Sequence, residues 1–435
     1  MTEKDLTRLY ELFRSCNGVT TDSRHCPEGS MFIALKGDKF NGNAYAASAL
    51  QSGCRCAVVD EADFCDPSDN RYFLVDDGLE TLQRLANYHR LQMGTKLIGI
   101  TGTNGKTTTK ELTAAVLGRK YNILYTQGNL NNSIGVPLTV LRLKAEHQLG
   151  IIEMGASHPG DIKELVDIAE PDCGLITNVG RAHLQGFGSF DGVVRTKTEL
   201  YDHLHGKEDT LAFLNADDEI LSAHAYGLRT VTYGTSADCF VQGRLEENGV
   251  FMSFGWKHGE GDTWHHVQTK LIGSYNFANA LAAATIGTYF GVDADDVCKA
   301  IEDYTPTNSR SELVHTDSNT LIVDAYNANP SSMQASIDNF RRLPMDGKML
   351  ILGDMRELGA DSEAEHQKVV DSLVSAGFKD VVLVGECFAR TRNNFVCVPD
   401  VGTLIDMLRK EKPAGKTILI KGSNGTRLYT LPQYL

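Results

Sequence analysis

The sequence predicts an α/β protein that is divided into three domains. Its 435 residues correspond to about three domains at roughly 150 residues each, and an apolar content of 42% is sufficient for real hydrophobic cores. From Lys96 onward, short apolar runs that end in Gly, Asp or Asn alternate with longer segments of helical period. This alternation is typical of parallel α/β units. We place the domains at residues 1–93, 94–305 and 306–435.

The first two domains differ in pattern. Residues 1–93 combine strand and helix signals around the glycine-punctuated segment Thr20–Asp60, which predicts a mixed α/β domain. In the central domain we expect a helix over Thr107–Lys120, an Ala-rich helix over Asn276–Tyr289, and short strands within Thr230–Gln268 such as Gly249–Phe254. The buried strands of this domain are expected at Lys96–Thr101, Leu149–Met154 and Gly174–Val179.

The C-terminal domain is predicted to hold a separate, Rossmann-like parallel sheet. Two of its helices carry start signals: Asn329-Pro330 suits an N-cap followed by proline, and Ser362–Glu365 fits a capping box. The turn-forming stretch Tyr304–Ser309 predicts a hinge before this domain. The strands are expected at Thr320–Tyr326, Lys348–Asp354, Val381–Glu386 and Thr417–Lys421.

Charge and composition exclude several classes of function. The chain has 42 Lys and Arg against 56 Asp and Glu, a formal charge of −14, which disfavours a large surface for nucleic acid or anionic lipid. No run approaches about 18 apolar residues, and the N-terminus lacks the apolar core of a signal peptide, so we expect no membrane insertion. Ten scattered cysteines without a CxxC pair favour small buried side chains over zinc or redox sites. We therefore expect a cytoplasmic protein in a reducing compartment. We also expect a monomer.

A glycine-rich loop follows the first central strand and opens a helix. Its pattern is G-x-x-G-K-T, shorter than the usual nucleotide loop because Ile100 stands where that loop has its first glycine. Backbone N–H groups and the helix dipole favour phosphate there, Lys106 would reach the terminal phosphates, and Thr107 would offer its hydroxyl to Mg²⁺. An ordinary turn is the alternative. We expect a P-loop-type mononucleotide-binding domain in which ATP contacts Gly102, Thr103, Asn104, Gly105, Lys106, Thr107 and Thr108.

Two further residues are candidates for holding a metal ion at the phosphates. Hard oxygen ligands are expected at the carboxyl ends of neighbouring strands. Glu153 ends an apolar strand, and His183 follows the strand that ends at Asn178-Val179-Gly180. A solvated glutamate and a structural histidine are the competing interpretations, and the position of both residues at strand ends favours the metal site.

Several motifs resemble those of the Mur ligases of peptidoglycan synthesis, over nearly the whole chain. Two of them resemble most closely the branch that adds D-alanyl-D-alanine, namely Asp324–Pro330 and Leu352–Gly359. The other similar stretches are Thr21–Arg24, Phe32–Gly37, Thr101–Glu111, Gly128–Pro137, Asn178–Leu184 and Lys421–Ser423. The sequence departs from the family at Asn43, where Asp-Gly-His is common instead of Asn-Gly-Asn, and at Asn424, where arginine is usual.

The resemblance implies an ATP-dependent ligase that adds D-alanyl-D-alanine to UDP-N-acetylmuramoyl-tripeptide, whose third residue is meso-diaminopimelate or Lys. The tripeptide carboxylate would form an acyl phosphate, which the amine of D-alanyl-D-alanine would then displace. This route has a physical reason, because a carboxylate is a poor electrophile and phosphorylation gives it a leaving group.

The resemblance also implies roles for individual residues. Lys106, Lys197 and His183 would be catalytic, with Lys197 carrying a carbamate that joins Thr107, Glu153 and His183 in binding metal. From the sequence alone, Lys197 is expected to be a solvated helix lysine. For Asn276 and Asn279, ordinary helix capping is the alternative. The resemblance instead places ATP against Asn276, Asn279, Arg310 and Asp324, and the UDP-peptide against Ser23, Arg24, Asn129, Asn131, Asn132, Asn327 and Asn329. For Asn131 and Asn132 a plain turn is an equal alternative.

Three other functions remain as alternatives. A ligase of the same fold would add a different amino acid or a glutamyl chain, and the Asn-Ala-Asn-Pro run at 327–330 argues against it. A small-molecule kinase would release a stable phosphorylated product. A non-catalytic nucleotide switch would bind nucleotide with negligible turnover.

Overall fold

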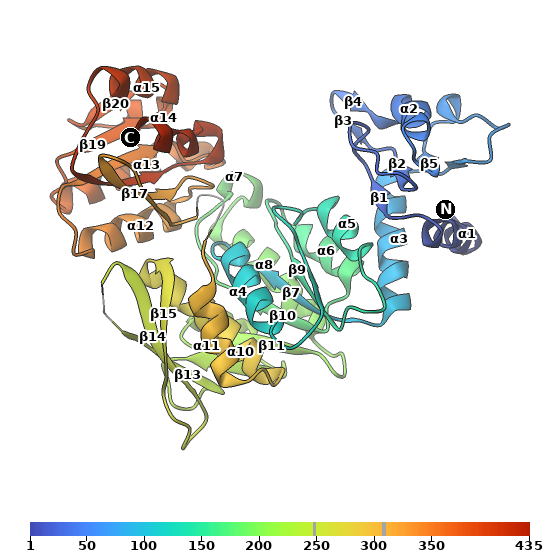
Figure 1. Ribbon diagram of the computed structural model, residues 1–435, viewed down its shortest axis with the longest axis horizontal. Coiled ribbons are helices and arrows are strands. Elements are labelled where there is room, and N and C mark those ends of the chain that lie inside the picture. Colours follow the sequence, from blue (N-terminus) through green and yellow to red (C-terminus); the bar gives the residue numbers. More distant parts are fainter. Residues whose placement is uncertain (247–248, 307–309) are drawn as a thin grey trace.

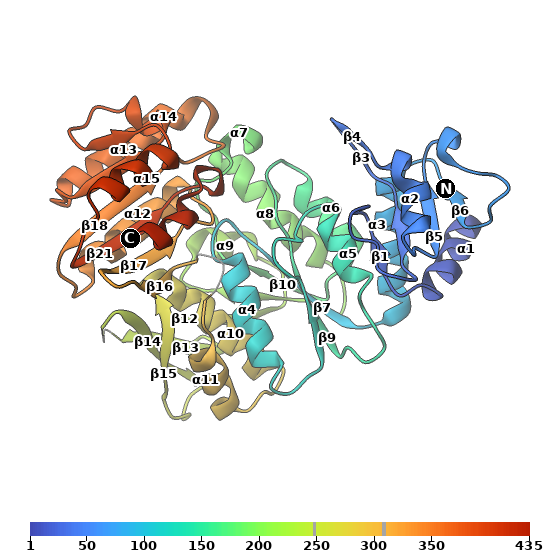
Figure 2. The ribbon, with the colours of Figure 1, turned by 45° about the horizontal axis from the view of Figure 1, so that its top comes forward.

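The computed structural model describes residues 1–246, 249–306 and 310–435. Three bodies lie in a row, with the N-terminal body (blue) at one end, the C-terminal body (red) at the other, and the central body between them (Figures 1 and 2). Each body has its own parallel or mostly parallel sheet. The predicted α/β fold with three domains is confirmed.

The N-terminal sheet has four parallel strands in the order β1-β2-β5-β6. The strands are β1 (Val19–Thr20), β2 (Met31–Ile33), β5 (Cys56–Val59) and β6 (Tyr72–Leu74), and β3 (Lys36–Gly37) and β4 (Phe40–Asn41) form a small hairpin. The helices are α1 (Glu3–Arg14), α2 (Ala46–Gln51) and α3 (Gly78–Met93), with 3-10 turns η1 (Gly42–Tyr45) and η2 (Ala62–Phe64).

The central sheet has nine strands in the order β15-β14-β13-β12-β11-β10-β7-β9-β8. The strands from β8 to β13 are parallel, and β14 and β15 continue the sheet antiparallel. The short strands expected within Thr230–Gln268 therefore extend this sheet. The strands are β7 (Lys96–Thr101), β8 (Ile123–Tyr125), β9 (Leu149–Glu153), β10 (Cys173–Ile176), β11 (Leu211–Asn215), β12 (Thr230–Gly234), β13 (Val241–Glu246), β14 (Phe251–His258) and β15 (His265–Ile272).

Helices cover both faces of the central sheet, which explains why its inner parallel strands β7, β9 and β10 are buried almost along their whole length. On β7, Leu97 packs into one core, whereas Ile98 and Ile100 pack into the other. The first core lies under α5 (Gly135–Val140), α6 (Asp161–Ala169) and α8 (Phe190–Leu204), and the second under α4 (Lys106–Leu117), α10 (Phe277–Tyr289) and α11 (Ala294–Asp303). The remaining elements are α7 (Leu184–Phe187), α9 (Glu219–His224) and η3 (Ser274–Asn276).

The C-terminal sheet has six strands in the order β16-β17-β21-β18-β19-β20, and only β16 is antiparallel among them. The strands are β16 (Glu312–His315), β17 (Asn319–Asp324), β18 (Lys348–Gly353), β19 (Val381–Val384), β20 (Val396–Val398) and β21 (Lys416–Lys421). The other elements are α12 (Pro330–Arg342), η4 (Gly359–Asp361), α13 (Ser362–Ser375), α14 (Glu386–Ala389), α15 (Val401–Lys410), η5 (Asn424–Thr426) and η6 (Leu428–Tyr434). The four strands predicted here are confirmed to within two residues.

One of the two predicted helix starts is correct. Asn329 caps α12, because its side chain accepts from the Ser332 N–H and Pro330 follows it. The capping box at Ser362–Glu365 is wrong. The chain enters α13 from a 3-10 turn, so the N-cap position falls on Asp361 in a helical conformation, without a side-chain cap. Ser362 lies inside the helix, and its hydroxyl faces Cys387 instead.

Three other expectations concern the chain as a whole. Within the described residues, every helix is too short or too polar to cross a bilayer. Of the expected hinge, residues 307–309 lie outside the described part of the chain. Small buried cysteines are confirmed at Cys54, Cys56, Cys173 and Cys239, but Cys397 is exposed and the other five are partly buried.

Candidate active site

A cavity of about 640 Å³ lies between the central and C-terminal domains. The carboxyl ends of β7 and β9 and the loops that follow them and β10 form one wall, and the segment after β17 forms the opposite wall. The carboxyl edge of a parallel sheet is where such folds bind ligands. Most of the residues singled out from the sequence line this cavity, and they come from both domains.

The glycine-rich loop lies between β7 and α4 and depends on two glycines. Gly102 has a φ of 135°, and an added Cβ would lie 2.0 Å from the Thr177 hydroxyl. Gly105 has a φ of 79°, and an added Cβ would lie 2.5 Å from Asn279. Only glycine allows these backbone conformations and close approaches. The loop therefore presents its backbone and the N-terminus of α4 to the cavity, which suits phosphate.

The Lys106 side chain is folded back onto this loop. Its Nζ donates to the carbonyl oxygens of Gly102 at 2.8 Å and Thr103 at 3.0 Å. Desolvation by the surrounding protein lowers the pKa of Lys106 to about 8, and the negative charge of Glu153 limits the fall. The ammonium group therefore stays largely protonated at neutral pH, in position to meet a phosphate.

Glu153 is buried at the end of β9, with 1% of its surface exposed. Its Oε1 accepts from the Thr107 hydroxyl at 3.1 Å and from Asn131 Nδ2 at 2.8 Å. Its Oε2 has no hydrogen-bond partner among the described residues, and Lys110 Nζ lies 3.6 Å away. A buried carboxylate with an unpartnered oxygen beside a hydroxyl fits a hard divalent cation. This geometry excludes the alternative of a solvated glutamate.

His183 lies in the cavity wall before α7, with a φ of 50°. Its Nδ1 pairs with the carboxylate of Glu357 from the C-terminal domain. Burial lowers the pKa of His183, with the positive charges of Lys106 and Lys197 acting in the same direction and Glu357 opposing. The lowered pKa favours the neutral imidazole, which is the form that ligates metals.

Lys197 is buried on α8, with 2% of its surface exposed. The expectation of a solvated helix lysine is therefore wrong, since α8 turns this residue toward the protein interior. Burial first, and then the charge of Lys106, lower its pKa well below the usual value. Its side chain lies near Phe187, with Nζ 5.6 Å from the ring centroid. Unlike Lys106 and His183, Lys197 is not part of the cavity wall.

The far end of the cavity is lined by Asn276, Asn279, Asp324 and Arg310. Asn276 occupies the N-cap position of α10 but its side chain makes no capping hydrogen bond, and Asn279 lies inside the helix. Asn276 Nδ2 donates instead to the Ile272 carbonyl oxygen, and Asn279 Nδ2 donates to Asn276 Oδ1, each at 3.0 Å. The Asp324 carboxylate accepts from Lys421 Nζ at 2.6 Å and from the Ser336 hydroxyl at 3.1 Å.

Arg310 lies over an aromatic ring of the C-terminal domain. Its guanidinium carbon is 4.0 Å from the centroid of the Tyr326 ring, a cation–π geometry. Both residues line the cavity, so Arg310 can face a ligand there.

The remaining predicted asparagines divide into two groups. Asn131, Asn132, Asn327 and Asn329 line the cavity. Asn132 Oδ1 accepts from the N–H groups of Ile134 and Gly135, as expected of a plain turn. Asn129 is exposed and lies outside the cavity wall.

Ser23 and Arg24 belong to the N-terminal domain and are not brought to this cavity. The Arg24 guanidinium pairs with Asp22, with Nε 2.9 Å from Oδ1. Asn43, where the sequence departs from the family pattern, also belongs to the N-terminal domain. It is buried, and its Nδ2 donates to Asp60 Oδ1 at 2.7 Å, so it helps to hold the structure of this domain.

The structure adds residues to which sequence reasoning gave no role. Lys110 and Lys421 are buried cations that face Glu153 and Asp324, and Glu357 reaches His183 from another domain. All three residues lie inside the family-like motifs described above. Their partners lie far away along the chain, and the spacing of the motifs does not indicate these pairs.

Comparisons with known proteins agree with this arrangement. Three family models match successive segments: "Mur ligase family, catalytic domain" over residues 15–90, "Mur ligase middle domain" over 100–287, and "Mur ligase, glutamate ligase domain" over 309–424. The UDP-N-acetylmuramoyl-tripeptide–D-alanyl-D-alanine ligase of Bacillus subtilis (strain 168) is 35% identical over 95% of this chain and 91% of its own length.

Two crystal structures have the same fold over nearly their full length. MurF from Acinetobacter baumannii superposes with a TM-score of 0.86 at 28% identity, covering 99% of this chain and 97% of that one. MurF from Thermotoga maritima in complex with ADP superposes with a TM-score of 0.85 at 25% identity, covering 98% and 97%. The chain therefore belongs to the Mur ligase family.

Proposed function

We propose that the chain joins D-alanyl-D-alanine to UDP-N-acetylmuramoyl-tripeptide, coupled to the cleavage of ATP to ADP and phosphate. The relatives that match nearly the whole chain at 30–35% identity bear the name of this activity. One observation of the structure carries the proposal. Lys106 of the phosphate loop, the buried Glu153 and Asn329 of the C-terminal domain line a single cavity.

The reaction proceeds in two displacements. A carboxylate oxygen of the tripeptide attacks the γ-phosphorus of ATP, and the bond to the β-phosphate oxygen breaks, which releases ADP. The amine of D-alanyl-D-alanine then attacks the acyl carbon, inorganic phosphate leaves, and the amine loses a proton. The loop N–H groups and the Lys106 ammonium stabilise the charge on the transferring phosphoryl group.

The residues around Glu153 fit a magnesium ion, which would supply positive charge at the phosphates. Thr107 Oγ1, a Glu153 oxygen and His183 are its proposed ligands. Support comes from the unpartnered Glu153 Oε2 and from the contact between Glu153 and the Thr107 hydroxyl.

Lys197 is proposed to carry a carbamate. A neutral amine attacks CO₂, a bond forms between Nζ and carbon, and one proton is released. The lowered pKa of Lys197 favours the neutral amine that this step requires, and the anionic product would be offset by the nearby Lys106.

ATP is proposed to lie along the cavity wall. The segment Gly102–Thr108 would hold the phosphates, Asn276 and Asn279 the adenine, Asp324 the ribose, and Arg310 the phosphates from the opposite side. Support comes from their positions around one cavity and from the ADP complex of the relative from Thermotoga maritima.

The UDP-peptide is proposed to extend from the N-terminal domain toward this cavity. Ser23 and Arg24 would contact its nucleotide end, and Asn129, Asn131, Asn132, Asn327 and Asn329 would contact its peptide end.

The proposed domain boundaries at 93 and 305 fall between the three segments that the family models match.

The test is phosphate release by the purified chain with ATP and UDP-N-acetylmuramoyl-tripeptide. We expect release only when D-alanyl-D-alanine is added, with either Lys or meso-diaminopimelate preferred at the third peptide position. Turnover with a single amino acid would identify a different ligase. A stable phosphorylated product would identify a kinase, and nucleotide binding without turnover would identify a switch.

A further inference from the structure

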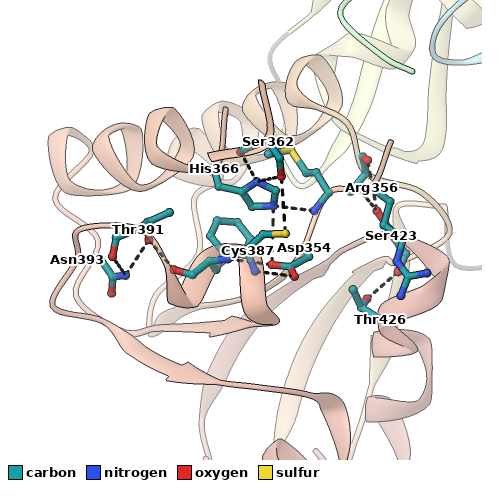
Figure 3. A network of polar contacts seen from close by, with 12 residues as sticks. Asp354, Arg356, Ser362, His366, Cys387, Thr391, Asn393, Ser423 and Thr426 are labelled. Carbon is teal, nitrogen blue, oxygen red and sulfur yellow. Dashed lines mark hydrogen bonds and ion pairs between the residues drawn. The ribbon is translucent and has the colours of Figure 1, made fainter. Parts of the chain in front are cut away.

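The segment after β18, residues 354–358, lies at the boundary between the C-terminal and central domains, and buried groups hold it in place. Met355 and Leu358 are 1% and 3% exposed. The N–H of Arg356 donates to the Ser423 hydroxyl at 3.1 Å (Figure 3). Burial and this hydrogen bond therefore anchor the segment, although it connects a strand to a helix.

A cluster of Asp354, His366 and Cys387 forms the base of this segment (Figure 3). The Met355 N–H donates to His366 Nε2 at 3.0 Å, so Nδ1 carries the imidazole proton and donates to the Ser362 carbonyl oxygen at 2.6 Å. The Asp354 oxygens accept from the N–H groups of Cys387 and Phe388, each at 3.0 Å. Both imidazole nitrogens and both carboxylate oxygens are thus engaged, so the cluster fixes the backbone instead of binding a metal ion.

Glu357 is the residue of this anchored segment that pairs with the central domain. Its backbone has a φ of 63°, a conformation that non-glycine residues adopt only when the surrounding structure determines it. Its carbonyl oxygen accepts from the Gln185 N–H at 3.3 Å, and its carboxylate pairs with His183 Nδ1. Gly359, two residues after Glu357, approaches Gln185 closely enough that an added Cβ would lie 3.2 Å from that side chain.

We infer that Glu357 is a positioning residue, a carboxylate from the C-terminal domain that fixes the ring of His183 and leaves Nε2 to face a metal ion. The inference rests on the proposed metal site. Histidines that ligate metals almost always donate their other N–H to such an acceptor, which sets the tautomer and orientation of the ring. An exposed ion pair alone would contribute little, but here the chain just before Glu357 is held by the bond from the Met355 N–H to His366, and the Glu357 carbonyl oxygen is held by Gln185.

This arrangement makes the metal site depend on the docking of the two domains. His183 belongs to the central domain, whereas its acceptor belongs to the C-terminal domain. The ring of His183 is therefore fixed only when the C-terminal domain lies against α7.

The test is Mn²⁺ affinity of the full chain, measured by electron paramagnetic resonance in the presence of a non-hydrolysable ATP analogue. Loss of such a second acceptor typically weakens metal binding by about 10- to 100-fold. We expect Glu357→Ala to weaken Mn²⁺ binding by about tenfold or more and to lower kcat, with KM for D-alanyl-D-alanine and the unfolding temperature unchanged. Glu363→Ala, which removes an exposed glutamate of the same domain, should leave Mn²⁺ affinity unchanged.

His183→Ala and the double variant distinguish the possible failures. If Glu357 acts through His183, Glu357→Ala should have no further effect on Mn²⁺ affinity once His183 is Ala. Unchanged Mn²⁺ affinity in Glu357→Ala, with a loss in His183→Ala, would overturn this inference and leave the metal site intact. Unchanged affinity in His183→Ala would overturn the metal site itself.

Discussion

Asn329 and Asn104 join the C-terminal domain to the phosphate loop. Asn329 Nδ2 donates to Asn104 Oδ1 at 2.8 Å, while Asn329 Oδ1 accepts from the Ser332 N–H and caps α12. One buried side chain thus starts a helix and contacts the loop at the same time. Because the two functions use different atoms of the amide, they can be separated by substitution.

Substitutions of Asn329 can separate its cap of α12 from its hydrogen bond to Asn104. Asp is as good an N-cap as Asn, but it cannot donate to Asn104, and its charge would oppose the phosphates. Asn329→Asp should therefore keep the unfolding temperature and raise KM for ATP. Asn329→Ala should raise KM and also lose about 1 kcal/mol of cap stability. Thermal unfolding and steady-state kinetics measure both variants. A wild-type KM for ATP in Asn329→Asp would show that the hydrogen bond to Asn104 does not support ATP binding.

Lys106→Ala should remove charge stabilisation at the transferring phosphate. We expect activity to fall by more than tenfold, which corresponds to a barrier change above about 1.4 kcal/mol. Lys163→Ala removes an exposed lysine that pairs with Asp167, and it should retain wild-type rates. Phosphate release measures both, and activity of Lys106→Ala within tenfold of wild type contradicts the assigned role.

Lys197→Ala should abolish activity if the carbamate forms. A small carboxylate such as acetate is expected to restore part of the activity by taking the place of the lost anion. The control is the same acetate added to the wild-type chain, where no stimulation is expected. Full activity of Lys197→Ala without additives would refute the carbamate.

Stability should fall as the pH drops below about 6.5, the pKa of histidine in an unfolded chain. Burial lowers the pKa of His89 and of His366 in the folded chain. Below that pH the unfolded state therefore binds protons that the folded state does not, and unfolding is favoured. Urea midpoints at pH 5.5, 6.5 and 7.5 check this sign. A midpoint that is highest at pH 5.5 would show that other groups dominate.

His366→Ala should destabilise the C-terminal domain by about 2 kcal/mol or more, since it leaves the Met355 N–H and the Ser362 carbonyl without their buried partner. His224→Ala, which removes an exposed histidine at the end of α9, should change stability far less. Urea unfolding followed by circular dichroism measures both, and equal midpoints would contradict the structural role of the Asp354 cluster.

The sequence predicted the parts of the site that depend on local order. The glycine spacing and the preceding apolar strand located Lys106 and Thr107, and the strand end located Glu153, because parallel strands bring their carboxyl ends to one edge. The interiors of the strands were predictable for a different reason. Helices cover both faces of the sheet, so these strands appear in the sequence as short apolar runs.

Other features depend on long-range packing and were not predictable from local pattern. Lys197 has the sequence of a solvated helix lysine, but α8 buries it. The capping box at Ser362 failed because a 3-10 turn already supplies the helix start. Glu357 gave no signal because its role depends on a histidine that lies 174 positions earlier and in another domain.

Isotope transfer shows whether the tripeptide carboxylate is activated as an acyl phosphate. UDP-N-acetylmuramoyl-tripeptide labelled with ¹⁸O in its terminal carboxylate is incubated with the chain, ATP and D-alanyl-D-alanine, and the released phosphate is analysed by mass spectrometry. We expect one ¹⁸O atom in each phosphate, because the attacking carboxylate oxygen leaves with phosphorus. Unlabelled phosphate accompanying peptide formation would contradict it.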